Sequence, residues 1–155
     1  MNWYLRVLRK YAVFSGRACR KEFWLFVLFN WIISLVLGLI DGVAGLVDAQ
    51  SKYGILRSLY ILAVLLPGVA VTVRRLHDTG RSGWWLAIFI GTPVIAVYSL
   101  MIISHLSSGL ESMPRLIGAV GFVICIMFLR FMAQDSQNGQ NQYGPNPKET
   151  SAQQV

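Results

Sequence analysis

Long apolar runs alternate with short polar segments along this chain. Four of the runs approach the roughly 20 helical residues that a bilayer core about 30 Å thick requires. They occupy residues 23–47, 55–73, 84–104 and 116–132. The pattern therefore predicts an all-α membrane protein with four transmembrane helices.

Three residues inside or beside these runs modify the picture without removing a span. The fourth run is the shortest, but Arg130 can extend its guanidinium to the interface while its stem stays in lipid. Pro67 and Pro93 interrupt the second and third runs, which membrane helices tolerate because neighbouring groups take up the freed carbonyls. We expect kinks at both prolines.

The first residues predict a helix of another kind. Over residues 2–14, Arg6, Arg9 and Lys10 fall on one helical face, and apolar and aromatic side chains fall largely on another. Such a helix lies in the headgroup layer with its basic residues toward anionic lipid. The alternative is a merely basic tail. Together with the four spans, this N-terminal segment is expected to form a single helical membrane domain over residues 1–133.

The remaining residues, 134–155, form a polar tail rich in Gln and Asn. It is too polar to build a core of its own, and we expect a flexible linker up to Gln140. The segment Tyr143-Gly144-Pro145 is stiffer, because proline fixes its own φ and restricts the residue before it. We hypothesise that this segment docks back on the basic segments. A disordered end is the alternative.

Composition supports the membrane class. The 155 residues are 55% hydrophobic and 14% charged, with a mean hydropathy of +0.53. The net charge of +7 would suggest nucleic acid in a soluble protein, but here the charges lie outside the apolar runs. Cys19 and Cys125 form no spacing pattern, so neither a disulfide framework nor a thiolate metal site is predicted.

The distribution of Lys and Arg predicts an orientation. Eleven of them lie in residues 1–22, in residues 74–83 and at the C-terminal end, and three lie in the other two connections. Positively charged connections resist translocation. Both termini and the loop after the second span are therefore expected in the cytoplasm.

That loop carries most of the candidate chemistry. Residues 74–85 read R-R-L-H-D-T-G-R-S-G-W-W. A turn with Gly80 at positive φ, followed by Ser82 as the cap of the next helix, is expected from the residue types. Asp78 can accept hydrogen bonds from one of the nearby arginines, Arg74, Arg75 or Arg81.

Two catalytic interpretations of the loop fail on chemistry. Asp78-Thr79-Gly80 spells the triplet of aspartic proteases, but that site needs two aspartates sharing a proton, and the arginines would keep Asp78 ionised. His77 and Asp78 resemble a metal pair, but a site needs three or four ligands, and His105 lies across the membrane in this topology. We predict no metal and no cofactor.

The same arginines could instead bind an anion. Together with the segment F-S-G-R-A-C-R-K at 14–21, where Ser15 could cap a helix, they would form a phosphate-sized basic pocket for a lipid headgroup. The candidate residues are Arg17, Arg20, Arg74, Arg75, His77 and Arg81. The alternative is a purely structural loop that reverses the chain.

Two glycines suggest a packing surface. Gly38 and Gly42 have the G-x-x-x-G spacing that lets membrane helices approach closely, in packing or in a homo-oligomer. Chance in a helix that contains glycine explains the spacing equally well. The adjacent Asp41 falls near the far interface, about 27 Å from Phe23, too far for a midplane proton relay.

Three ordered motifs resemble a known family. F-S-G-R-A-C-R-K-E-F-W, R-R-L-H-D-T-G-R-S-G-W-W and N-Q-Y-G-P-N-P are similar to the signatures of YhaH-like bacterial inner-membrane proteins, the domain of unknown function 805 family. The resemblance runs from about Met1 to Lys148, with departures at Cys19 and in residues 105–115. It implies a multi-pass protein of the bacterial inner membrane, but no reaction, substrate or cofactor.

The predicted function is therefore a non-enzymatic membrane module that interacts with the bilayer, chiefly anionic phospholipid, or with a protein partner that the sequence does not name. A small oligomeric transporter or pore is the first alternative. An enzyme that acts on lipid headgroups through the basic loop is the second.

Overall fold

The computed structural model describes residues 3–47, 54–106 and 113–147, and these form five helices. The helices are α1 (Trp3–Arg9), α2 (Arg20–Val43), α3 (Ile55–Asp78), α4 (Trp84–Leu106) and α5 (Met113–Ala133). Helices α2 to α5 are each long and apolar enough to cross a membrane. The predicted all-α fold with four spans and a short N-terminal helix is confirmed.

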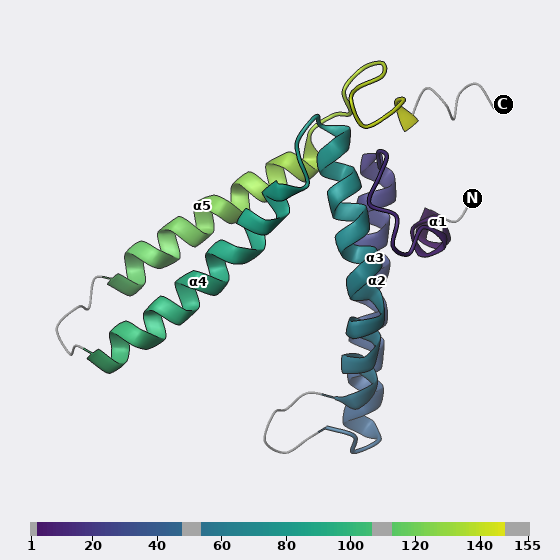
Figure 1. The fold of residues 1–155 in the computed structure, drawn as a ribbon. Helices are drawn as coiled ribbons and strands as arrows, with labels where there is room; N and C mark the ends of the chain where they lie inside the picture. The colour runs from purple at the N-terminus through teal and green to yellow at the C-terminus, as the bar shows by residue number, and fades with distance from the viewer. Residues whose placement is uncertain (1–2, 48–53, 107–112, 148–155) are drawn as a thin grey trace.

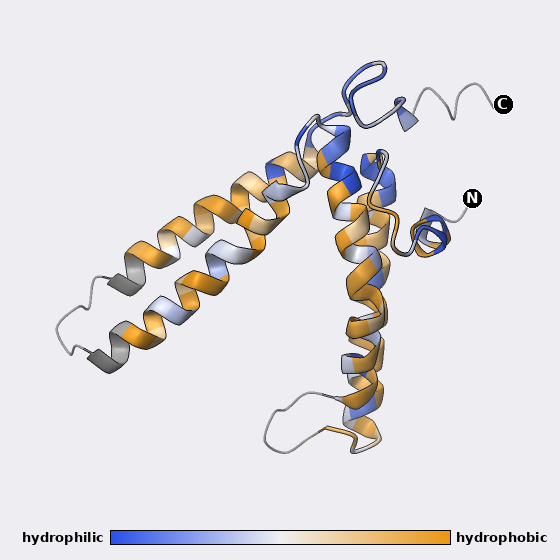
Figure 2. Ribbon diagram, in the orientation of Figure 1, coloured by the Kyte–Doolittle hydropathy of each residue, from blue (hydrophilic) through white to orange (hydrophobic). Residues whose placement is uncertain are grey.

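The long helices form two antiparallel hairpins, α2 with α3 and α4 with α5 (Figure 1). The hairpins meet at one end and diverge toward the other, so the molecule has the outline of a V. The C-terminal segment lies at the joined end, and helix α1 lies just below it, against the α2/α3 hairpin. Figure 2 shows apolar residues along the four long helices, whereas hydrophilic residues gather at the joined end.

The helix bounds differ from the predicted ones where local hydrogen bonding decides them. Helix α2 spans Arg20–Val43 instead of residues 23–47. It ends early because Gly45, with φ of 67°, lets the Leu46 amide donate to the Asp41 carbonyl at 2.9 Å. Helix α3 spans Ile55–Asp78, beyond the predicted 55–73, so residues 74–78 are helical.

Helix α3 ends in the same way. Gly80 has φ of 74°, which only glycine adopts at low cost. The Gly80 amide donates to the His77 carbonyl at 3.0 Å, and the Arg81 amide donates to the Leu76 carbonyl at 2.9 Å. This pair of bonds is the Schellman motif. The expected turn at Gly80 is therefore present, as the stop of a longer helix.

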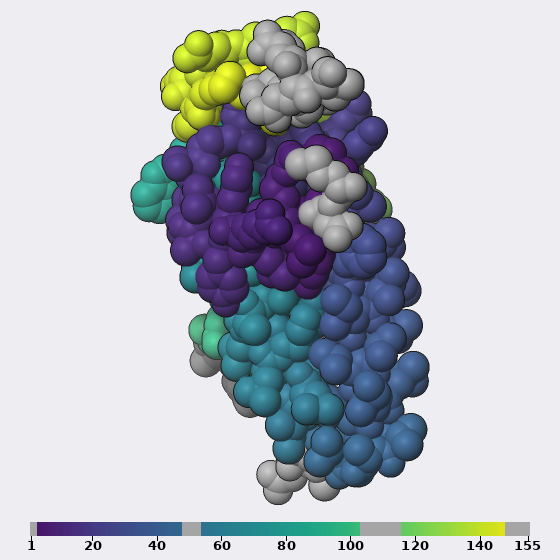
Figure 3. Space-filling view, turned by 90° about the vertical axis from the view of Figure 1, so that its right-hand side faces the viewer, coloured from purple at the N-terminus to yellow at the C-terminus, as the bar shows by residue number. Residues whose placement is uncertain are grey.

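Helix α1 is shorter than the predicted 2–14 and runs across the α2/α3 hairpin below the joined end (Figures 1 and 3). Val7 on its inner side is fully buried, and the Tyr4 ring stacks on Phe26 with centroids 5.5 Å apart. Arg9 and Lys10 are exposed on the outer side. The helix is therefore amphipathic and is held to the bundle by its aromatic and apolar face.

The buried core lies beneath the joined end. Its members come from α1, α2, α3, α5 and the segment before α2, and they are Val7, Ala18, Phe23, Phe26, Val71, Leu76 and Met132. Away from this cluster the long helices expose large apolar side chains; Val43, for example, is 91% exposed. Surfaces so apolar are suited to lipid or to a partner helix.

Asp41 joins α2 and α3 at the opposite end. Its carboxylate accepts hydrogen bonds from the backbone amides of Leu56 at 3.0 Å and Arg57 at 2.9 Å. Gly54, the N-cap of α3, makes no side-chain cap. The buried Asp41 therefore satisfies two of the free amides at the start of α3.

The two candidate packing glycines differ in what they contact. A Cβ atom at Gly38 would lie 3.5 Å from Cδ of Arg57, so Gly38 faces α3. A Cβ atom at Gly42 would meet nothing within 4 Å. The G-x-x-x-G pair is therefore not a single contact surface within this chain, and its role in pairing with another copy stays a prediction.

Candidate functional site

Three segments meet at the joined end of the hairpins, and we call them together the collar. They are residues 14–22 before and within α2, residues 74–83 at the end of α3 and in the following turn, and residues 133–147 after α5. The Ala18 amide donates to the Arg74 carbonyl at 3.1 Å, and the Gln137 amide donates to the Asp78 carbonyl at 3.0 Å. Backbone bonds thus connect all three segments.

Asp78 lies at the centre of the collar and is fully buried. Its Oδ1 accepts from Nε of Arg17 at 2.8 Å, and its Oδ2 accepts from Nη1 of Arg75 at 2.5 Å and from the hydroxyl of Ser136 at 2.5 Å. We call these four residues the Asp78 clasp. The partners come from all three segments, so one carboxylate joins the segment before α2, the end of α3 and the C-terminal segment that follows α5.

The two arginines of the clasp use their other hydrogens on backbone carbonyls. Arg17 donates to the carbonyls of Gly139 at 2.7 Å and Gln137 at 2.6 Å. Arg75 donates to the carbonyl of Met132 at 3.1 Å and also to that of Gln134. Each guanidinium is therefore almost fully engaged within the protein, which is what makes a buried charge tolerable.

Arg74 forms a second buried ion pair. Its Nη1 donates to Oε1 of Glu22 at 2.8 Å, and both side chains are almost completely buried. Its Nε and Nη2 have no hydrogen-bond partner among the described residues. The sequence predicted that Asp78 could accept from Arg74, Arg75 or Arg81. The Arg75 alternative is confirmed, whereas Arg74 pairs with Glu22 because it lies on the side of α3 that faces α2.

Arg20 and Arg81 lie nearer the surface. Arg20 pairs with Asp135 and donates to the Ala133 carbonyl at 3.1 Å, and its side chain is 41% exposed. Arg81 donates to Oε1 of Gln134 at 2.6 Å and lies over the ring of Phe131. Burial lowers the pKa of the Arg81 guanidinium from its ordinary value, but an arginine remains charged at neutral pH. Because its guanidinium contacts Gln134 and Phe131, Arg81 is not among the partners of Asp78 that the structure shows.

The C-terminal segment docks on the other two segments of the collar. The ring of Tyr143 stacks on the imidazole of His77, with centroids 3.8 Å apart and planes 3° from parallel. The side-chain amide of Asn141 donates to the His77 carbonyl at 2.9 Å. The hypothesis of docking is confirmed. The expected flexible linker up to Gln140 is not what the structure shows, because its carbonyls bind the clasp arginines.

The two candidate cap serines differ. Trp84 donates its amide to the hydroxyl of Ser82 at 3.4 Å, so Ser82 stands in the cap position of α4. Ser15 does not cap α2, because that helix begins at Arg20 and its N-cap is Cys19 without a side-chain bond. The extended residues between Ser15 and the helix instead bring Arg17 to Asp78.

The collar has few groups available for chemistry. Asp78 and Glu22 are buried in ion pairs. The His77 ring stacks on Tyr143, and its Nδ1 lies 3.3 Å from the Gly16 carbonyl oxygen. Over the described ranges there is no cluster of three or more metal-ligating side chains. The arrangement is suited to holding segments together, with an excess of positive charge, since five arginines face three carboxylates.

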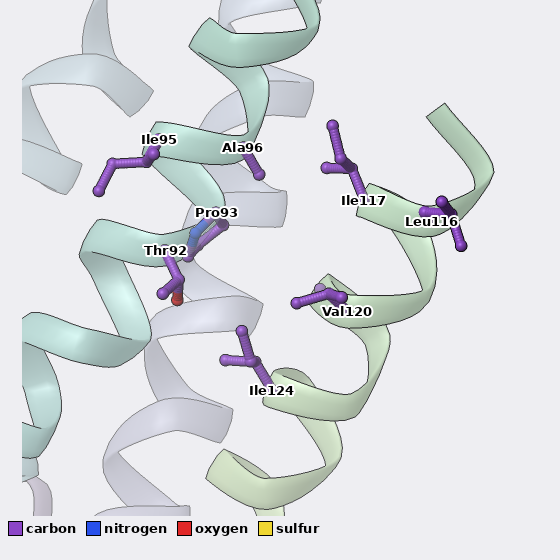
Figure 4. Close-up of a pocket in the computed structure, with 9 residues that line it drawn as sticks. Thr92, Pro93, Ile95, Ala96, Leu116, Ile117, Val120 and Ile124 are labelled. Atoms are coloured by element: carbon purple, nitrogen blue, oxygen red, sulfur yellow. The ribbon is translucent and has the colours of Figure 1, made fainter. Parts of the chain in front are cut away.

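A cavity of about 260 Å³ lies between α4 and α5 (Figure 4). Ala96, Ile117, Val120 and Ile124 point into it. Thr92 brings the one hydroxyl of the lining, and this hydroxyl donates to the Ile88 carbonyl at 2.5 Å. Binding sites orient ligands with a few convergent polar groups. This cavity offers none that is free, so it is a packing gap and no candidate site.

The sequence interpretation missed the acidic and polar partners of the arginines, namely Glu22, Asp135, Ser136 and Gln137. A signal was available. The chain has only seven acidic residues, and Glu22, Asp78 and Asp135 all lie at span ends that the orientation rule places together. Arginines that end in apolar surroundings need such partners.

Comparison with known proteins gives a consistent result. The family model described as "Protein of unknown function (DUF805)" matches residues 11–145. The chain is 40% identical over 148 residues to the inner membrane protein YhaH of Escherichia coli strain K12, covering 96% of this chain and 98% of that protein. No solved structure matches the chain.

Two further relatives from the same organism are similar to this chain. The inner membrane protein YhaI is 36% identical over 148 residues, with 96% of this chain and 97% of the relative covered. The uncharacterized protein YiiR is 38% identical over 77 residues, about half of each chain. These likenesses extend over all three segments of the collar in the two full-length relatives.

Proposed function

The chain belongs to the DUF805 family, and from that premise we propose that it is a non-enzymatic module of the bacterial inner membrane that associates with anionic phospholipid. The observation that carries this proposal is the division of the basic residues into two sets. One set is buried and engaged in holding the collar together. The other is exposed around it.

The buried set supports a structural role. Arg17, Arg74 and Arg75 are paired with carboxylates inside the protein. An external anion would have to compete with partners that are already in place and desolvated. Of the six candidate anion-binding residues, Arg20 and Arg81 are therefore the better placed for a headgroup.

The exposed set supports association with lipid. Arg9, Lys10 and Lys21 are exposed on α1, just after it and at the start of α2. A basic residue near an anionic bilayer surface contributes about 1 kcal/mol of attraction. With both termini in the cytoplasm, as the charge distribution predicts, these side chains would face the anionic leaflet.

Native mass spectrometry from mild detergent tests the proposal. The protein is extracted from bilayers containing phosphatidylethanolamine and phosphatidylglycerol, and the retained lipids are identified. We expect phosphatidylglycerol to be enriched over the bulk ratio. An Arg9→Gln, Lys10→Gln, Lys21→Gln variant should lose most of this enrichment, because the exposed charges are gone while the clasp is intact.

The matched variant is Arg20→Gln with Arg81→Gln, which removes the two partly exposed guanidiniums of the collar. If this double variant retains less phosphatidylglycerol than the wild type, the lipid headgroups bind at the collar itself. Retention of both lipids in their bulk ratio by the wild-type protein would refute the proposal.

A transporter or pore is the alternative function. Such proteins place ionisable groups along a path for ions or protons. Asp41 is the acidic residue of α2 that lies farthest from the collar. Its carboxylate already accepts hydrogen bonds from two backbone amides of α3. Ion flux in reconstituted vesicles that disappears in Asp41→Asn would favour the alternative over the lipid-associated module.

A further inference from the structure

A groove opens where the two hairpins part, between α3 and α4. Its volume is about 800 Å³, within the range of ligand-binding pockets. The α3 wall carries Val69 and Val73, and the α4 wall carries Ala87, Ile90 and Gly91. The groove shares His77, Ser82 and Gly83 with the collar, but no residue of the Asp78 clasp lines it.

The groove is a wedge. At its narrow end a Cβ atom on Gly83 would lie 3.0 Å from Cγ1 of Val73, so α3 almost touches the start of α4 there. At Gly91 a Cβ atom would meet nothing within 4 Å, so α4 has moved away from α3. Eight residues separate the two glycines, a rise of about 12 Å along the helix.

Small residues hollow the α4 wall. Gly83, Ala87 and Gly91 follow one another at intervals of four residues, so they lie on one face of the helix, and all three line the groove. A stripe of this kind commonly receives a second helix. A helix about 10 Å across does not fit a wedge that closes at Gly83, whereas a single acyl chain does.

The polarity of the groove runs in one direction. The collar residues His77 and Ser82 line the narrow end, and the wide end is lined by aliphatic side chains. Arg81, which directly precedes Ser82 and is half-buried, supplies positive charge near the polar end. The arginines that are paired inside the collar are Arg17, Arg74 and Arg75. A phospholipid has the same order, with a phosphate at the interface and hydrocarbon beyond it.

We propose that the wedge between α3 and α4 is a binding site for one membrane phospholipid, with an acyl chain between Val73 and Gly91 and the phosphate beside Ser82 and His77. This inference rests on the proposed association with lipid and assigns it a place. Trp84, 80% exposed at the mouth of the groove, belongs to the interfacial end of the site.

Photolabelling in nanodiscs tests the site. The probe is phosphatidylglycerol with a diazirine in one acyl chain, mixed into phosphatidylethanolamine, and labelled residues are mapped by peptide mass spectrometry. We expect label concentrated on residues 69–77 and 83–91. A Gly91→Leu variant, which fills the groove, should reduce label on these residues about ten-fold, as a change of about 1.4 kcal/mol in affinity would.

Gly118→Leu on α5 is the matched control. A Cβ atom at Gly118 also meets nothing within 4 Å, and both glycines are helical, so neither variant is expected to disturb folding. Ala87→Leu provides a second filling variant on the same wall. Label on the wedge should fall in both filling variants and stay unchanged in Gly118→Leu.

Three outcomes overturn the inference. Label spread evenly over all four long helices would show no preferred site, and equal loss in Gly118→Leu would show no role for the wedge. Cross-links from residues 83–91 to a second copy, with dimers in native mass spectrometry, would show that another protein chain occupies the groove. Enrichment of phosphatidylglycerol with evenly spread label would leave the proposed function standing without this site.

Discussion

At the scale of single residues, the collar depends on carboxylates that are buried between guanidiniums. Asp78 forms ion pairs with Arg17 and Arg75, which lie 58 residues apart in the sequence, and Glu22 forms an ion pair with Arg74. Such groups are stable only as a set, because removing one partner leaves the other charged and desolvated. The effect of a substitution therefore depends on whether it breaks a pair or replaces it.

Asp78→Asn breaks the clasp. The amide cannot balance two buried arginines, and we expect a loss of about 3–5 kcal/mol of stability, seen as a lower midpoint of thermal unfolding in detergent. Asp135→Asn is the control, since that pair with Arg20 is largely exposed and should change stability by about 1 kcal/mol or less. Equal losses in the two variants would contradict the central place of Asp78.

The Glu22–Arg74 pair makes a different prediction. Glu22→Leu alone should destabilise the protein by about 3–5 kcal/mol, because Arg74 would be buried without a counter-charge. Glu22→Leu combined with Arg74→Met should recover most of that loss, since two apolar side chains fill the site without desolvated charge. A double variant less stable than the single one in a double-mutant cycle would be inconsistent with this account.

The sequence predicted which residues are charged and at which end they gather, but not how they pair. Composition and the orientation rule placed Arg17, Arg74 and Asp78 together. The choice of Arg17 over Arg74 for Asp78 depends on which side of α3 faces α2, and this is set by the helical phase and by packing of Phe23 and Phe26. Apolar runs carry little information on phase, because nearly every face is apolar.

At the scale of elements, the lengths of the helices are set by interactions at the helix ends. Helices α2 and α3 both stop at a glycine with positive φ, Gly45 and Gly80. The extension of α3 through residues 74–78 was missed because four of those five residues are polar, and hydropathy ends a span where polar residues begin. The helix continues because its side chains find partners in the collar.

The start of α3 gives the prediction at this scale. Asp41→Ala removes the acceptor of two amides at that helix end, and we expect a loss of about 0.5–2 kcal/mol, the usual cost of a lost cap. Faster deuterium exchange at Leu56 and Arg57, with exchange in α5 unchanged, would accompany it. Unaltered exchange at these two amides would show that Asp41 does not hold them.

At the scale of the whole molecule, two hairpins are joined at the collar and diverge beyond it (Figure 1). The number of spans and the joined end could be predicted from apolar runs and charge. The divergence could not, because it depends on how the α3–α4 turn and the docked C-terminal segment fix the angle between hairpins. The splayed arrangement is what opens the wedge to the bilayer.

The joined end of the hairpins can be used to determine the orientation of the molecule in the membrane. Because α1, the collar and the C-terminal segment lie together, one reporter determines the side of all three. A fluorescent protein that matures only in the cytoplasm, fused after Lys148, should be fluorescent. A dark fusion with normal expression would place the collar on the other side of the membrane and rule out the proposed contact with the cytoplasmic leaflet.

The central claim is that the Asp78 clasp couples the α2/α3 hairpin to the end of α5 and to the C-terminal segment. Deuterium exchange of the full chain in lipid nanodiscs, wild type against Asp78→Asn, tests it most directly. The account predicts slow exchange at Ala18, Gln137 and Asn141 in the wild type, and faster exchange at all three in the variant. Fast exchange at Gln137 and Asn141 in the wild type, or no change in the variant, would contradict it.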